Sequence, residues 1–367
     1  MVTSSGKNSM KYHINRNSEY SLATITQRKS DTVAALISVD IHQERTAEGE
    51  VTELAYRDAL LSGTKKKSRD EFLSATNLLG ASIGVSVSDS VLTISIKSTT
   101  DTFTKVLKLM EEMLLTPAFP NTEMSRIKST VTNELHASKD NSNLAAHEGL
   151  LNAIYGAGDR KYSFDADELI AVVPKLTRAS LTKMHKTSLA QPWTCSITGD
   201  NKKCEEFERL VKKVKKNIKS KEILSMSIHQ QKPAISKSVI KDIPSRQNVD
   251  LSIGAPVPFT LHHPDYIPLS FGLAVLAKWS GFAGRLMSTV REKEGLTYTI
   301  YGRLEGFSGT EQGYWRIMTF FAPDKTVEGL KSTFREISKI HKSGITDNEL
   351  VRFKEILETQ QSCSATQ

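Results

Sequence analysis

Several features that mark other classes of protein are scarce in this chain of 367 residues. It has only three cysteines and no C-x-x-C pair, which argues against a disulfide framework and indicates a reducing compartment. No apolar run approaches the roughly 18 residues of a membrane-spanning helix, and the first residues lack the apolar stretch of a secretory signal. We therefore expect no membrane span and a soluble location, either the cytoplasm or an organellar matrix.

Motifs of several enzyme classes are also missing. No G-x-S-x-G nucleophile elbow occurs, and no cysteine lies in a context typical of a nucleophile. The glycines of "WSGFAGRL" are not followed by G-K-[ST], so they do not form a phosphate loop. His136 and Asp140 are four residues apart, and His262 and His263 are adjacent, but neither pair has a third ligand nearby. We interpret these histidines as isolated hydrogen-bonding residues.

The chain carries a formal net charge of +8, with basic and acidic residues interleaved along its length. The densest basic run is "KKVKKNIKSK", from Lys212 to Lys221. A run of this kind can bind nucleic acid or an anionic surface. No aromatic or glycine-rich RNA-binding motif flanks it. We therefore interpret it as a solvated helix end that leads into a linker, and we expect no nucleic-acid partner.

Local patterns divide the first half of the chain into strands and helices. Alternating β-branched runs predict strands, and apolar residues three and four apart predict helices. Gly63 ends the first helix, and Ser68 with Glu71 forms a capping box at the start of the second. We expect residues 1–17 to be disordered. The predicted strands are 21–28, 33–42, 81–88, 91–98 and 193–200, and the predicted helices are 51–62, 68–79, 101–117, 121–138, 143–155, 165–172, 177–187 and 205–216.

The second half repeats this order of elements. Its predicted strands are 247–256, 297–306 and 313–323, and its predicted helices are 265–278, 284–292, 326–343 and 344–358. Each half has a strand, helices, a hairpin and then a long helix, which indicates an internal duplication. We predict the α+β class with two tandem homologous domains, each a mainly antiparallel sheet with helices packed on one face. The predicted domains are 1–217 and 245–367, joined by a basic, serine-rich linker at 218–244.

Four stretches of this pattern resemble those of a known family: "LLSGTKKKSRDEF", "MEEMLLTPAFPNTEMSRIKSTVTNELHASKDN", "SGFAGRLMSTVREKEGLTYTIYG" and "GITDNELVRFKE". The third is the most specific, because it combines G-x-x-x-R-L with R-E-K-x-G-L-x-Y. Over residues 12–358 the chain resembles the pitrilysin/insulinase family of zinc peptidases. That family includes the mitochondrial processing peptidase and the core proteins of the cytochrome bc complex.

The resemblance implies a metal site, from which this sequence departs. The family binds zinc with both histidines of an H-x-x-E-H helix and a distant glutamate, and the glutamate of the motif acts as general base. Counted back from Gly63, the three motif positions fall on Leu54, Arg57 and Asp58, and the distant glutamate is Glu134. Leu54 has no donor atom and Arg57 is a permanent cation. We therefore expect no catalytic residue and no zinc in this chain.

Two pairs of residues remain of interest within this frame. Arg57 could form an ion pair with Glu134 and substitute for the charge of the zinc, or both groups could reach solvent separately. In the second half, the resemblance implies that Arg291 and Tyr298 contact the substrate backbone and help to stabilise the tetrahedral intermediate. The alternative is a structural arginine and a strand tyrosine.

The resemblance implies a non-catalytic subunit that supplies Arg291 and Tyr298 to the active site of a zinc-bearing homologous peptidase, as a heterodimer. A homo-oligomer is the other assembly that we consider. Substrates would be peptides added to an edge strand, and bacterial-type pairs are favoured because the long glycine-rich loop of the mitochondrial non-catalytic subunit is missing. The alternatives are a scaffold without proteolytic role, like the cytochrome bc core proteins, and an active peptidase with an unrecognised metal site. Family chains continue beyond the "GITDNEL" helix, so the second domain is expected to be truncated.

Overall fold

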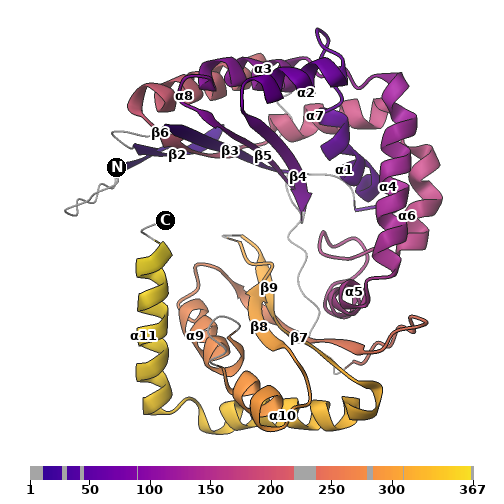
Figure 1. Ribbon diagram of the computed structural model, residues 1–367, viewed down its shortest axis with the longest axis vertical. Helices are drawn as coiled ribbons and strands as arrows, with labels where there is room; N and C mark the ends of the chain where they lie inside the picture. Colours follow the sequence, from indigo (N-terminus) through magenta and orange to yellow (C-terminus); the bar gives the residue numbers. More distant parts are fainter. Residues whose placement is uncertain are drawn as a thin grey trace. The chain divides into compact units, whose positions relative to one another are not determined.

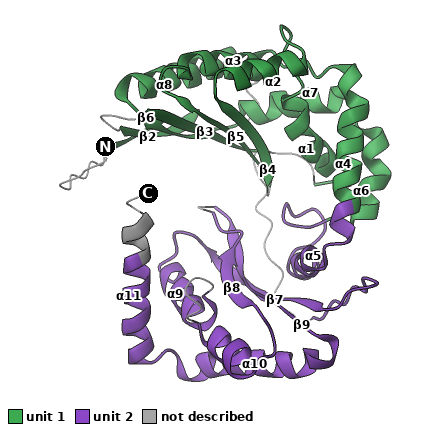
Figure 2. Cartoon of the chain, viewed as in Figure 1, with its two compact units in different colours: residues 1–136, 164–227 green, residues 137–163, 228–367 purple. Residues whose placement is uncertain are grey.

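The computed structural model describes residues 11–26, 31–41, 45–88, 90–218, 237–278, 284–308 and 310–364. The chain divides into two compact units, which are coloured separately in Figure 2. Unit 1 comprises residues 1–136 and 164–227, and unit 2 comprises residues 137–163 and 228–367. Most of the predicted linker lies outside the described residues.

The sheet of unit 1 has six strands in the order β1-β2-β6-β3-β5-β4 (Figure 1). Its neighbouring strands are antiparallel except for the parallel pair β2–β6, because β6 follows a long helical segment and returns beside β2. The strands are β1 (Lys11–Arg16), β2 (Tyr20–Thr26), β3 (Thr32–Asp40), β4 (Ser82–Ser88), β5 (Val91–Thr99) and β6 (Trp193–Gly199).

The first strand corrects the expectation that residues 1–17 are disordered. β1 pairs in antiparallel register with β2, with Lys11 opposite Thr26 and Arg16 opposite Ser21. The side-chain oxygen of Asn17 accepts hydrogen bonds from the backbone N–H groups of Glu19 and Tyr20, at 2.8 and 2.9 Å, and so fixes the hairpin turn. Residues 1–10 lie outside the described part of the chain.

One face of this sheet is covered by helices, among which α3 and α8 lie side by side in Figure 1 and contact each other. Amphipathic spacing places their apolar residues against the buried side chains of the strands, which form one continuous core. The helices of unit 1 are α1 (Ala47–Leu60), α2 (Arg69–Leu78), α3 (Phe103–Leu115), α4 (Met124–Lys139), α6 (Ala166–Val172), α7 (Arg178–Ala190) and α8 (Asn201–Asn217), with short 3-10 turns at Asn121–Glu123 and Val173–Lys175.

The opposite face of the same sheet carries mainly small hydroxyl side chains. Cross-strand register aligns them in rows, and one row runs Ser21, Thr194, Ser38, Thr93, Ser86 across β2, β6, β3, β5 and β4. The alternation explains this division, because residues two apart in a strand share a face. The buried partners on the helical face are Val33, Ala35, Ile37 and Val39 of β3 and their equivalents.

Unit 2 is built on a smaller antiparallel sheet in the order β7-β9-β8. Its strands are β7 (Val249–Thr260), β8 (Ile300–Glu305) and β9 (Gln312–Phe321). Its other elements are α5 (Ser142–Ile154), α9 (Tyr266–Ala277), the π-helix η4 (Met287–Lys293), a 3-10 turn (Pro323–Lys325), α10 (Thr326–Ser343) and α11 (Asp347–Ser364). The core of this sheet lies on the side of α9 and η4 and includes Ile317 and Phe321. The predicted α+β class with mainly antiparallel sheets is confirmed.

Helix α5 belongs to unit 2, although it precedes the predicted linker. It packs against β7, and polar contacts hold its first residue and its middle. The Ser142 hydroxyl donates to Asp250 at 2.6 Å, and His147 Nε2 lies 2.7 Å from the Tyr314 hydroxyl. Sequence periodicity identifies this helix but cannot say which sheet it covers.

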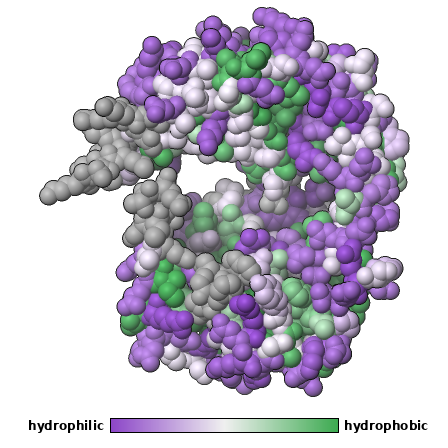
Figure 3. Space-filling view, viewed as in Figure 1, coloured by the Kyte–Doolittle hydropathy of each residue, from purple (hydrophilic) through white to green (hydrophobic). Residues whose placement is uncertain are grey.

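The surface of the described chain is mostly polar on the face drawn in Figure 3. Most of the large apolar residues that are exposed belong to unit 2, such as Ile240 and, on one helix, Val327 and Phe334, whereas Leu78 belongs to unit 1. Within the described residues, every helix is either too short or too polar to cross a membrane.

Candidate functional site

Helix α1 carries the positions at which the family resemblance would place a metal motif. Thr46 caps its start by accepting a hydrogen bond from the Gly49 N–H at 3.1 Å. One face of the helix is fully buried, including Ala55 and Tyr56. Leu54 is half-buried and packs against the core of unit 1. It therefore serves as an apolar packing residue at the position where the family motif has a metal-binding histidine.

The structure brings Arg57 and Glu134 together. A guanidinium NH2 of Arg57 on α1 donates to a carboxylate oxygen of Glu134 on α4. The two side chains are 34% and 48% exposed, so the pair is a solvent-facing link between the helices and contributes little to stability by itself. The guanidinium thus stands beside the carboxylate that the resemblance identifies as the third ligand.

Asp58 is held by a second ion pair between the same helices. Arg126 on α4 contacts the Asp58 carboxylate at 3.4 Å, and its other NH2 group donates to the Ser62 hydroxyl at 3.0 Å. The Arg126 Nε also donates to Glu123 at 2.6 Å. Arg126 is a residue of this site that no sequence motif singled out. Its spacing of eight residues from Glu134, two turns on one helical face, is the signal that could have identified it.

These contacts leave no metal centre of the family type. Of the four predicted positions, one is apolar, one is a permanent cation and the two carboxylates are each paired with an arginine. No group of three or more His, Cys, Asp or Glu side chains in the described residues is arranged to hold a metal ion. The residues present therefore do not fit a catalytic zinc, which needs three protein ligands and an open position.

The turn after α1 explains why Gly63 and Thr64, from which the motif positions were counted, occur in the sequence. Gly63 has φ of +104°, and a Cβ there would lie 2.6 Å from the Lys67 carbonyl oxygen. Only glycine fits this left-handed, crowded position. Thr64 then accepts hydrogen bonds from the N–H groups of Lys66 and Lys67 at 3.2 and 3.1 Å. The "GT" pair is thus a structural requirement of the turn into α2, independent of metal binding.

Beneath the metal-motif positions lies a buried polar network that the sequence did not reveal. His185 Nε2 donates to the Leu114 carbonyl at 2.9 Å, so its Nδ1 must accept the hydrogen bond from the Tyr56 hydroxyl at 2.7 Å. Burial lowers the pKa of His185 to about 4 and raises the pKa of Tyr56. Both groups are therefore neutral at physiological pH and tie α1 to α7 and to the end of α3.

Arg291 and Tyr298 form a stacked pair in unit 2. The guanidinium carbon of Arg291, on the π-helix η4, lies 5.0 Å from the centre of the Tyr298 ring, which is cation–π geometry. Tyr298 is 71% exposed, which is unusual for a large aromatic side chain, and Arg291 is half-buried. Both can therefore present hydrogen-bond donors to a ligand at the surface of this unit.

Comparison with known protein families assigns both halves of the chain. Residues 26–164 match the family described as "Insulinase (Peptidase family M16)", and residues 175–357 match the one described as "Peptidase M16 inactive domain". The matched ranges include all six predicted site positions. No curated protein matches the chain.

Three solved structures have a similar fold. A peptidase M16 inactive domain from Pseudomonas fluorescens is 23% identical, with a TM-score of 0.81 over 95% of this chain and 83% of that one. A protease from Helicobacter pylori is 15% identical, with a TM-score of 0.76 over 97% and 86%. A conserved protein from Enterococcus faecalis is 16% identical, with a TM-score of 0.72 over 97% and 86%. Identities this low establish the shared fold alone.

Proposed function

The chain belongs to the insulinase family of peptidases, family M16, and on this premise we propose that it is the non-catalytic subunit of a two-subunit zinc metallopeptidase. Its partner would be a homologous subunit with an intact H-x-x-E-H motif. This chain would bind the peptide and supply Arg291 and Tyr298 to the partner's active site.

The observation that carries the proposal is a contrast between the two sets of site residues. In unit 1, arginines pair with both carboxylates at the motif positions, so the metal-motif frame is retained without metal ligands. In unit 2, an arginine and a tyrosine are stacked on each other, and the tyrosine ring is exposed. This combination supports a role in peptide hydrolysis through a partner subunit that supplies the metal ligands.

The chemistry of Arg291 and Tyr298 suits a peptide that is being cleaved. Attack on a peptide carbonyl develops negative charge on its oxygen, and preorganised donors aimed at that oxygen lower the barrier. The guanidinium provides a fixed positive charge at every working pH, and the phenol provides one further donor. Before attack, the same groups can hold the substrate carbonyl in place.

Strand β4 offers a way to hold the peptide backbone. It is the end strand of the unit 1 sheet, and it contacts α1, the helix of the metal-motif positions. An extended peptide can add to such an edge through backbone hydrogen bonds, which makes binding largely independent of sequence. The neutral hydroxyl face of the same sheet is compatible with a broad range of peptides.

The test is to purify the full chain alone and together with the homologous zinc-bearing subunit of the same organism. Cleavage of fluorescein-labelled casein should require both chains and should fall about a hundredfold when Arg291 is replaced by alanine in this chain. The Glu328→Gln variant, which alters an exposed ion pair on α10, is the matched control. Cleavage that is unaffected by Arg291→Ala would refute the proposed role. A stable complex without any cleavage would favour the scaffold function instead.

A further inference from the structure

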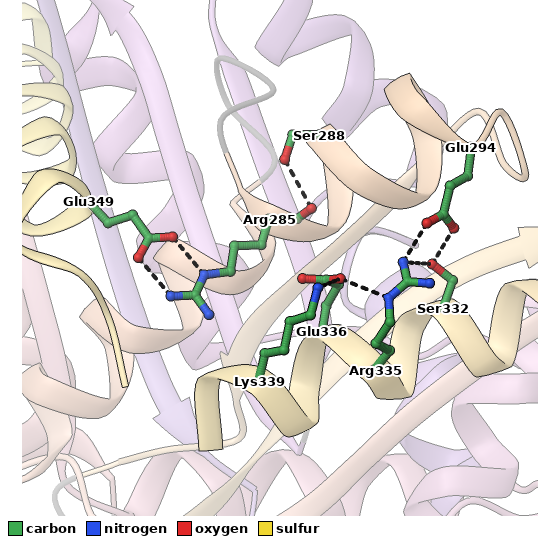
Figure 4. A network of polar contacts seen from close by, with 8 residues as sticks. All are labelled: Arg285, Ser288, Glu294, Ser332, Arg335, Glu336, Lys339 and Glu349. Atoms are coloured by element: carbon green, nitrogen blue, oxygen red, sulfur yellow. Dashed lines mark hydrogen bonds and ion pairs between the residues drawn. The ribbon is translucent and has the colours of Figure 1, made fainter. Parts of the chain in front are cut away.

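We propose that two ion-pair clamps, Arg285–Glu349 and Glu294–Arg335, hold the π-helix η4 in the register that presents Arg291 to Tyr298. This inference rests on the proposed function, because it assigns positioning residues to the Arg291–Tyr298 pair. Figure 4 shows both clamps around η4, with Arg285 before the π-helix and Glu294 directly after it.

The first clamp joins the start of this segment to α11. Arg285 donates from Nε and NH2 to the two carboxylate oxygens of Glu349, at 2.6 and 2.7 Å, and from NH2 to the Gly344 carbonyl at 2.9 Å. Such a bidentate pair fixes direction as well as distance. Glu349 is itself oriented by Thr346, whose N–H and hydroxyl donate to it at 2.8 and 2.9 Å.

The second clamp joins the end of the segment to α10. Glu294 accepts hydrogen bonds from Arg335 and from the Ser332 hydroxyl. Arg335 is held in turn by Glu336 at 3.1 Å, and Lys339 donates to Glu336 at 2.8 Å. The Glu294 carboxylate therefore meets a preassembled set of donors on one face of α10, as Figure 4 shows.

The π-helix is the element that the two clamps enclose. π-helical turns are rare, occur mostly as single turns and are frequent at functional sites. Here seven residues adopt this winding, and Arg291 is the fifth of them. Gly295, with φ of +63°, closes the helix by donating its N–H to the Arg291 carbonyl at 3.0 Å. A change from π to α winding would rotate Arg291 relative to Tyr298, so the register decides whether the pair forms.

Tyr298 has a separate anchor. The Thr319 hydroxyl on β9 donates to the Thr299 carbonyl at 2.9 Å and lies 3.3 Å from the Thr297 hydroxyl. The Thr297 hydroxyl also accepts a hydrogen bond from the Thr299 N–H at 3.2 Å. The backbone on both sides of Tyr298 is thus fixed to the sheet, and the clamps act at the two ends of the segment that carries Arg291.

Both clamps stay charged over the working pH range. The hydrogen bonds from Arg285 lower the pKa of Glu349 to about 2, and those from Ser332 and Arg335 lower the pKa of Glu294. The clamps are therefore fixed structural links and not pH switches.

Hydrogen–deuterium exchange of the full chain tests the clamps without reference to activity. Glu349→Gln keeps the size of the side chain and an acceptor for Thr346 but removes the charge, and Glu294→Gln does the same at the other clamp. We expect the amides of residues 287–296 to exchange about tenfold faster in both variants. The control Glu328→Gln also lies on α10, in an exposed ion pair away from these contacts, and should leave exchange unchanged. Equal exchange in all three variants would overturn the proposal.

A second measurement separates positioning from a loss of folded protein. In the complex with the zinc-bearing subunit, Glu349→Gln and Glu294→Gln should lower kcat for labelled casein about tenfold with KM unchanged, and Glu349→Asp should recover part of the loss. A fall in activity that only follows the folded fraction of the chain would overturn the positioning role. If Arg291→Ala leaves cleavage unchanged, the proposed function fails, and the exchange experiment still decides the clamps.

Discussion

At the scale of single residues, two arginines dominate the positions that the family resemblance assigns to a metal motif. Arg57 stands where the resemblance places the general base, and Arg126 pairs with Asp58, where it places the second ligand. Both ion pairs connect α1 and α4. They hold these two helices together without forming a metal site. Because they are partly exposed, we assign them a local electrostatic role and not a large share of stability.

Restoring the ligands should restore metal binding. The triple variant Leu54→His, Arg57→Glu and Asp58→His creates the H-x-x-E-H spacing on α1 opposite Glu134. We expect it to bind one zinc per chain, measured by plasma emission spectroscopy after dialysis, since two histidines four residues apart and a carboxylate form a zinc site. The same variant with Glu134→Ala is the control and should bind zinc more weakly. Equal affinity in the two would show that the register is wrong.

His185 should make the folded chain sensitive to acid. The unfolded chain takes up a proton on this residue below pH 6.5, whereas the buried side chain resists protonation until about pH 4. The stabilisation that the neutral His185 gives the folded state is therefore present above pH 6.5. It is lost as the pH falls toward 4, which lowers the free energy of unfolding by up to about 3 kcal/mol. Urea unfolding should show that the free energy of unfolding falls less between pH 7 and pH 5 in His185→Gln than in the natural chain. His341 is exposed, so His341→Gln should show the same fall in the free energy of unfolding as the natural chain. The same fall in His185→Gln would contradict the role of His185 in acid sensitivity.

At the scale of elements, the assignment of α5 to unit 2 depends on close packing against β7. A Cβ on Gly254 of β7 would lie 2.3 Å from the Trp315 carbonyl oxygen and 3.0 Å from the Leu150 side chain of α5. The strand therefore needs a glycine where the helix approaches it. The need for glycine at this position comes from the packing of α5 on β7 and cannot be predicted from the local sequence of β7.

Gly254→Ala should therefore destabilise the chain, by about 1–3 kcal/mol, because neither the backbone carbonyl nor the helix can move away freely. Gly272→Ala on α9 is a matched control, since a Cβ there has no heavy atom within 4 Å. Alanine inside a helix should be neutral or stabilising by up to about 1 kcal/mol. Thermal unfolding followed by circular dichroism compares them, and equal melting temperatures would argue against the tight contact.

At the scale of the whole molecule, the chain should behave as a protein without a structural metal. The described residues contain no group of three or more His, Cys, Asp or Glu side chains that could hold a metal ion, so zinc has no folded site among them to stabilise. Adding zinc or the chelator 1,10-phenanthroline should leave the melting temperature of the lone chain unchanged within about 1 °C. The triple variant described above should gain several degrees with zinc. A zinc-dependent rise in the natural chain would mean a site outside the described residues.

The sequence by itself determined what depends on short-range pattern and residue type. Alternation and capping residues predicted most strands and helices. The L-x-x-R-D pattern at Leu54, Arg57 and Asp58 predicted that a family-type zinc site is missing, because that prediction depends on side-chain chemistry alone. The family assignment, confirmed by the matches to both halves, also followed from local strings.

Tertiary structure decided what depends on contacts between distant segments. These include the strand β1, the parallel pair β2–β6, the packing of α5 in unit 2 and the bridge from Arg126 to Asp58. The π winding around Arg291 belongs with them, because the clamps to α10 and α11 lie some 40 to 60 residues further along the chain. Local periodicity reports which face of a segment is apolar, but only the folded chain determines which partner covers that face.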